Sequence, residues 1–104
     1  MIEVNKQQDG STLTISLKGV LDTPAKPALE EALSGCYTGL KKLVFDFSEL
    51  EYITSAGIRV ILKAQNEMDK LDGEMVLVHV SKDIMDVFNL TGFSDVLDIR
   101  DSAM

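Results

Sequence analysis

The chain has 104 residues, of which 45% are hydrophobic and 26% charged, and its formal net charge is −7 at pH 7. This length suffices for one domain with one hydrophobic core, spanning residues 1–104, and excludes a catalytic domain joined to a regulatory one. The acidic excess argues against direct nucleic-acid binding, which needs a cationic surface to displace counterions from phosphates, and favours a protein partner with basic patches.

Targeting and redox signals are sparse. No apolar run approaches the length that crosses a bilayer, and the N-terminus lacks a secretory pattern, so we expect a cytoplasmic protein without membrane insertion. Cys36 is the single cysteine, which excludes an internal disulfide and a cysteine-based metal cluster. We expect Cys36 to be a small core or loop residue.

The first half of the chain predicts two strands, a helix and a third strand. Residues 2–7 and 12–18 partly alternate apolar and polar side chains around Asp9-Gly10, which suits a hairpin turn. We expect Asp22 or Thr23 to cap a helix that holds Pro24 in its first turn. Residues 43–47 are apolar on both faces, as in an interior strand, with Asp46 as the exception.

The second half predicts two more strand and helix units. Residues 55–71 form a helix whose apolar arc exceeds half its circumference, so one flank packs on another helix or remains an interaction surface. Residues 75–80 form a strand, and Ser81 caps a last helix that ends near residue 90. Residues 96–99 add a short strand or strap. The order ββαβαβα predicts an α/β fold with a mixed four- to five-stranded sheet packed by helices.

Three motifs resemble one known family. The stretch from Leu43 to Leu62 contains Leu-Val-Phe-Asp-Phe-Ser and then Tyr-Ile-Thr-Ser-Ala-Gly-Ile-Arg-Val-Ile-Leu. It resembles the signature of STAS domains, specifically bacterial anti-sigma factor antagonists. Gly19-Val-Leu-Asp22 and Asn89-Leu-Thr-Gly-Phe93 resemble two further elements of that family. The three motifs occur in the family's order, and the resemblance covers most of the chain.

The resemblance implies a binding module switched by phosphate. The unphosphorylated protein would sequester an ATP-dependent anti-sigma factor serine kinase and so free a sigma factor. That kinase would phosphorylate Ser55 and end the binding. A metal-dependent serine phosphatase would remove the phosphate and restore the binding. Thr54 stands where the best-known members have Asp, which leaves it as a second, weaker candidate acceptor. The implied phosphosite neighbourhood and partner-binding residues are Asp22, Thr23, Asp46, Thr54, Ala56, Gly57, Ile58, Arg59 and Lys63.

The residues alone also allow simpler roles. Ser55 can be an ordinary N-cap of its helix. Asp46 can accept loop N–H groups and pin a turn, and residues 48–51 match a capping box that indicates only a local turn. Arg59 and Lys63, one helical turn apart, can be a solvated stripe, although Arg59 could pair with a phosphate on Ser55.

We expect no enzyme, no cofactor and no metal site. The chain lacks a glycine-rich phosphate loop, a Gly-x-Ser-x-Gly elbow and a His-Glu-x-x-His motif, and its single histidine, His79, is expected to be a partly buried strand residue. The free protein is expected to be a monomer. Two alternatives remain: a STAS subunit of a membrane transport complex, and a ligand-sensing STAS module with a pocket at the strand ends.

Overall fold

Five strands form one mixed sheet, and three helices connect the parallel strands. The computed structural model describes residues 2–100. Its elements are β1 (Ile2–Asp9), β2 (Thr12–Leu21), α1 (Lys26–Leu33), β3 (Lys42–Ile53), α2 (Ser55–Lys70), β4 (Glu74–Val78), α3 (Lys82–Thr91), the 3-10 turn η1 (Phe93–Asp95) and β5 (Ile99–Arg100). The strands lie in chain order, with β1 antiparallel to β2 and the others parallel.

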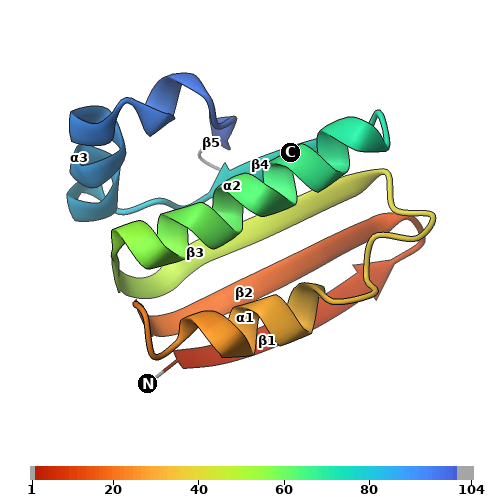
Figure 1. Ribbon diagram of the computed structural model, residues 1–104, viewed down its shortest axis with the longest axis horizontal. Helices are drawn as coiled ribbons and strands as arrows, with labels where there is room; N and C mark the ends of the chain where they lie inside the picture. Colours follow the sequence, from red (N-terminus) through yellow and green to blue (C-terminus); the bar gives the residue numbers. More distant parts are fainter. Residues whose placement is uncertain (1, 101–104) are drawn as a thin grey trace.

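This strand order explains where the helices lie. Parallel connections are almost always right-handed, so crossovers that all step in the same direction place their helices on the same face of the sheet. Figure 1 shows α1 and α2 lying in front of the sheet, with α3 near one end. The predicted α/β architecture is confirmed, and β5 completes the five-stranded version of the sheet.

The main core lies between this face of the sheet and the helices. Ile15, Phe45 and Leu77 of the sheet and Leu29 and Ile61 of the helices are all fully buried in it. Three valines of β3 and β4 form a separate small cluster, Val44, Val76 and Val78. Because neighbouring strand residues point to opposite faces, these valines mark the reverse face of the sheet.

Two predicted boundaries were wrong. Helix α1 begins at Lys26 with Ala25 as its N-cap, so neither Asp22 nor Thr23 caps it. A carboxylate oxygen of Asp22 instead accepts the N–H of Ala25 at 3.1 Å and holds the turn that precedes the helix. Residues 48–51 are extended rather than a turn, because Lys18 and Gly19 of β2 pair with Glu49 and Leu50 after a register shift.

The later elements follow the prediction closely. Helix α2 runs from Ser55 to Lys70. The hydroxyl of Ser81 caps α3 by accepting the N–H of Ile84 at 3.3 Å, and Gly92 ends that helix in a left-handed conformation with φ of 81°.

Candidate functional site

The junction between β3 and α2 is anchored to the end of β2. The Leu21 carbonyl accepts the backbone N–H of Thr54 at 3.0 Å, and the Thr54 hydroxyl donates to the same carbonyl at 3.5 Å. Thr54, not Ser55, is the N-cap of α2, and its side chain makes no capping bond to the helix. The simple interpretation of Ser55 as the N-cap was therefore wrong.

Close packing beneath the first turn of α2 depends on a glycine. A Cβ atom at Gly57 would lie 2.6 Å from the Leu21 side chain, 2.8 Å from the Leu21 carbonyl oxygen and 2.9 Å from the Ile53 side chain. Gly57 and Ile58 are both buried. These two residues were expected in the partner-binding patch, but their burial means that they support it from beneath and offer a partner little surface.

Ser55 is the exposed first residue of α2. The first N–H groups of a helix lack intrahelical acceptors, and the earliest such bond in α2 runs from the N–H of Ile58 to the carbonyl of Thr54 at 3.0 Å. The first turn of α2 contains no acidic side chain. An anionic group on Ser55 would thus meet free N–H donors and the positive end of the helix dipole.

The end of β2 borders this position. Leu21 contacts Thr54 through its carbonyl, so Asp22 and the exposed Thr23 directly follow the anchoring point. Asp22 also lines a hollow of about 420 Å³ together with Ile2, Pro24, Ala25 and Ala28. The sequence-predicted residues Asp22, Thr23, Thr54 and Ser55 are therefore brought to one edge of the molecule.

Two exposed side chains extend this edge. Arg59 lies one turn along α2 from Ser55 and is exposed, as predicted. Tyr52, three residues before Ser55, is 48% exposed, and sequence reasoning missed it because it lies in the segment interpreted as strand end and turn. Its exposure beside buried Ile53 follows from strand alternation, and exposed tyrosines are enriched at protein interfaces. We define the patch as Thr23, Tyr52, Thr54, Ser55 and Arg59.

Asp46 lies away from this patch. It occupies the middle of β3 rather than its end, because the strand continues to Ile53. Asp46 and Ile53 pair with Ser16 and Leu21 of β2, and those five strand positions correspond to roughly 17 Å. Asp46 alternates with the core residues Phe45 and Phe47 and therefore points to the reverse face. The structure thus separates Asp46 from the patch along β3, and a role for Asp46 in the phosphosite neighbourhood stays a prediction.

The Asp46 carboxylate instead organises the end of β4. One oxygen accepts the N–H of Ser48 at 2.9 Å and lies 3.0 Å from Nδ1 of His79. Partial burial acts to raise the pKa of Asp46, but hydrogen bonds from Ser48 and His79 outweigh it and lower the pKa overall. His79 is exposed, follows β4 and has a left-handed φ of 57°, so the prediction of a partly buried strand residue was also wrong.

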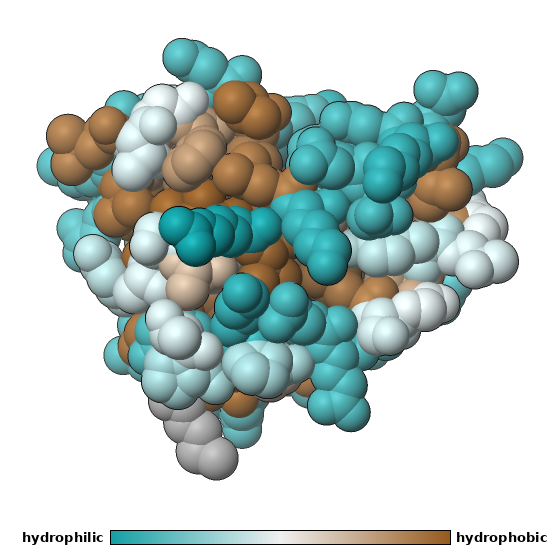
Figure 2. Space-filling model, in the orientation of Figure 1, coloured by the Kyte–Doolittle hydropathy of each residue, from teal (hydrophilic) through white to brown (hydrophobic). Residues whose placement is uncertain are grey.

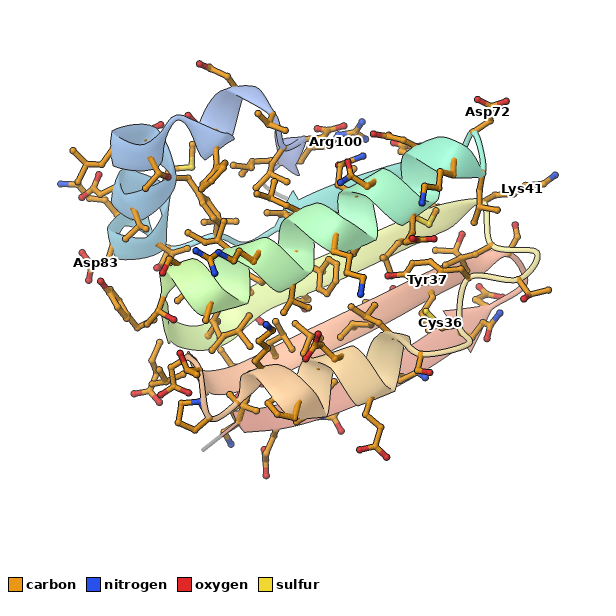
Figure 3. All side chains as sticks on the ribbon, in the orientation of Figure 1. Cys36, Tyr37, Lys41, Asp72, Asp83 and Arg100 are labelled. Atoms are coloured by element: carbon orange, nitrogen blue, oxygen red, sulfur yellow. The ribbon has the colours of Figure 1, made fainter. Side chains whose placement is uncertain are left out.

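Lys63 belongs to a different part of the surface. It lines a groove between α1 and α2, and the space-filling view shows hydrophobic side chains at the bottom of this region between hydrophilic ones (Figure 2). The half-buried Cys36 and Tyr37 lie in the loop after α1 (Figure 3), as expected of Cys36 as a loop residue.

Within residues 2–100, no group of three or more His, Cys, Asp and Glu side chains is placed to hold a metal ion. No helix of that range is both long enough and apolar enough to cross a membrane.

Comparison with known proteins identifies relatives over almost the whole chain. The STAS domain profile matches residues 3–103. BtrV of Bordetella bronchiseptica, a provisionally named anti-sigma factor antagonist, is 31% identical over 91 residues, which cover 86% of this chain and 78% of that protein. An anti-sigma-B factor antagonist of Listeria monocytogenes is 29% identical over 97 residues, covering 91% and 84% of the two chains.

Solved structures share the fold at lower identity. The anti-sigma factor antagonist SpoIIAA in its unphosphorylated form superposes with a TM-score of 0.82 at 20% identity, covering 94% of this chain and 88% of that one. An anti-sigma factor antagonist from Mycobacterium paratuberculosis gives a TM-score of 0.87 at 21% identity, covering 99% and 88%. These anti-sigma factor antagonists are regulatory binding proteins rather than enzymes, and the matched profile covers nearly the whole chain. The chain belongs to the STAS domain family of anti-sigma factor antagonists.

Proposed function

We propose that this protein is a phosphorylation-switched anti-sigma factor antagonist with Ser55 as the phosphoacceptor. The unmodified patch binds an anti-sigma factor serine kinase and frees a sigma factor. Phosphorylation of Ser55 by that kinase ends the interaction, and a metal-dependent serine phosphatase restores it. SpoIIAA, which shares the fold, has been determined in a phosphorylated form, and this supports the proposal by analogy of fold.

The observation that carries the proposal is the contrast between two neighbouring hydroxyls. The Ser55 hydroxyl belongs to an exposed residue at the uncapped start of α2. The Thr54 hydroxyl is directed to the Leu21 carbonyl in a partly buried position. A kinase therefore reaches Ser55 more readily than Thr54, which favours Ser55 as the acceptor.

The electrostatic effect of the phosphate is large at an interface. A phosphoserine carries about 1.5 to 2 negative charges at pH 7, which a partner must desolvate in order to bind. The charge lies at the positive end of α2, so the fold itself tolerates it. Binding is thereby lost without refolding.

The test compares charge variants in binding to the cognate kinase. We expect Ser55→Ala to bind like the unmodified protein and to remain bound in the presence of ATP, and Ser55→Asp to bind at least about tenfold more weakly, as measured by calorimetric titration. Ser81→Asp is the matched control, since it adds the same charge at the start of α3 where Ser81 already caps the helix.

Mass mapping after incubation with kinase and ATP identifies the acceptor. Phosphate on Thr54 rather than Ser55, or equal affinity of Ser55→Ala and Ser55→Asp for the kinase, would reject the proposal.

A further inference from the structure

A groove of about 290 Å³ lies between α1 and α2, outside the Ser55 patch. Glu30 and Leu33 of α1, Tyr37 of the following loop, and Val60, Lys63 and Glu67 of α2 line it. Its volume is just below the roughly 300–1,000 Å³ typical of ligand sites, which suits only a small molecule. It lies between helices and not at the strand ends, where a ligand-sensing module of this fold was expected to have its pocket.

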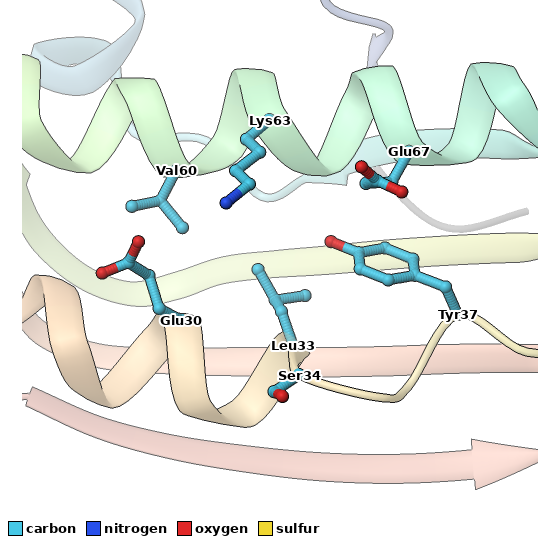
Figure 4. A pocket seen from close by; sticks show the side chains of 7 residues that line it. All are labelled: Glu30, Leu33, Ser34, Tyr37, Val60, Lys63 and Glu67. Carbon is cyan, nitrogen blue, oxygen red and sulfur yellow. The ribbon is translucent and has the colours of Figure 1, made fainter.

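Polar groups from both helices converge on this groove. Figure 4 shows the Lys63 ammonium and the Tyr37 hydroxyl directed into the space between α1 and α2, with the carboxylates of Glu30 and Glu67 beside it. Within residues 2–100, no hydrogen bond or ion pair engages the Glu30 carboxylate, the Lys63 ammonium or the Tyr37 hydroxyl. Glu67 is paired with Lys70 at 3.4 Å. Three polar groups are therefore available to a ligand.

Two of these groups donate hydrogen bonds at neutral pH. Burial raises the pKa of Tyr37 to about 12, with further contributions from Cys36 and Glu67, so its phenol keeps its proton. The Lys63 ammonium is a second donor. Both suit an anionic oxygen, whereas the Glu30 carboxylate suits a cationic amine.

The charges and the apolar lining narrow the class of ligand. A phosphate dianion would face two carboxylates, and a simple cation would face Lys63, so a molecule with one anionic and one cationic group matches best. Leu33 and Val60 are only 5% and 4% exposed and form an apolar floor. That floor can cover a short aliphatic body.

We propose that the groove between α1 and α2 binds a small zwitterion of the α-amino acid class with a short apolar side chain. Its carboxylate accepts hydrogen bonds from Lys63 and Tyr37, its ammonium pairs with Glu30, and its side chain rests on Leu33 and Val60. This site goes beyond the Ser55 switch and does not rest on it.

The test uses the full chain and L-leucine as the probe, followed by two-dimensional ¹⁵N NMR. We expect saturable shifts centred on the groove residues, with a dissociation constant on the order of 0.1–10 mM for so small a ligand. Two analogues test the charge argument. The carboxylate without the amine, 4-methylpentanoate, and the amine without the carboxylate, isopentylamine, should each bind about tenfold more weakly.

Matched variants test the residues. Lys63→Met and Tyr37→Phe should each weaken leucine binding about tenfold, whereas Lys82→Met, which removes a charge at the start of α3, should leave it unchanged. Ser55→Ala should also bind leucine normally, which separates this site from the switch. Absence of saturable shifts, equal binding of the analogues, or normal binding by Lys63→Met would overturn the proposal.

Discussion

At the scale of single residues, Gly57 shows how backbone packing sets the position of the Ser55 patch. The start of α2 approaches β2 so closely that no side chain fits between Gly57 and Leu21. Gly57 lies in the family motif, and the lack of space for a Cβ atom is sufficient to explain why glycine occupies this position, without any contact to a partner.

We expect Gly57→Ala to lower the free energy of unfolding by about 1–3 kcal/mol, because the added methyl group would overlap Leu21 and Ile53 and force α2 to shift. Urea denaturation measures the loss. Gly73→Ala is a useful comparison, since its added methyl group would chiefly meet the flexible end of Met68 at 2.6 Å. A smaller loss is expected there, and a Gly57→Ala protein of unchanged stability would contradict the steric argument.

Asp46 offers a second prediction at this scale. Its pKa in the folded protein is lowered from 3.8, so the carboxylate stabilises the fold above pH 3.8 and this contribution disappears as the pH falls through the folded pKa. We expect Asp46→Asn to cost about 1 kcal/mol near neutral pH and progressively less below pH 3.8.

Denaturation at several pH values across this acid range measures the difference in the free energy of unfolding between the unmodified protein and Asp46→Asn. Asp95→Asn is the control, because Asp95 is exposed. A ¹³C titration of the Asp46 carboxyl group gives its pKa directly. A midpoint at or above 3.8 would refute the assignment.

At the scale of elements, the uncapped start of α2 allows a charge on Ser55 to stabilise the fold while it weakens binding to the partner. An acidic side chain near a helix N-terminus typically contributes about 0.3–1 kcal/mol of stability at low salt. The first turn of α2 has none, so we expect Ser55→Asp to raise the free energy of unfolding by about 0.5 kcal/mol.

Thermal and urea unfolding at low and high salt measure this effect, which should shrink as salt screens the charge. A Ser55→Asp protein that unfolds more readily than the unmodified one would mean that the weakened partner binding reflects damage to the fold, and would remove the basis for a switch without refolding.

Elements also show where sequence reasoning succeeds. Helix α2 is predicted within one residue because its apolar residues recur with helical spacing, and Ser81 and Gly92 mark the ends of α3 by known capping preferences. Strand β3 is longer than predicted because register shifts against β2 break the simple alternation while keeping Leu50 and Ile53 buried. Pairing with β2, which is distant in sequence, determines where β3 ends, and the local pattern of residues 42–53 does not reveal that pairing.

At the scale of the whole molecule, the length of β3 separates Asp46 from the patch around Ser55. The family resemblance implied that Asp46 lies near Ser55, and the apolar run at residues 43–47 predicted that β3 ends soon after Asp46. The strand in fact ends at Ile53. Asp22 and Thr54 follow the ends of β2 and β3, which the parallel pairing brings to one edge of the sheet. For the groove between α1 and α2, the sequence predicted only the broad apolar arc on α2. The polar groups of the groove could not be predicted, because they come from three separate segments that only the fold brings together.

For the proposed Ser55 switch, the anchoring of Thr54 to Leu21 has a kinetic consequence. The start of α2 is already fastened to the sheet through the Thr54 backbone and hydroxyl, so we expect no slow rearrangement to precede phosphorylation. The response time would then follow enzyme turnover and the dissociation of the partner.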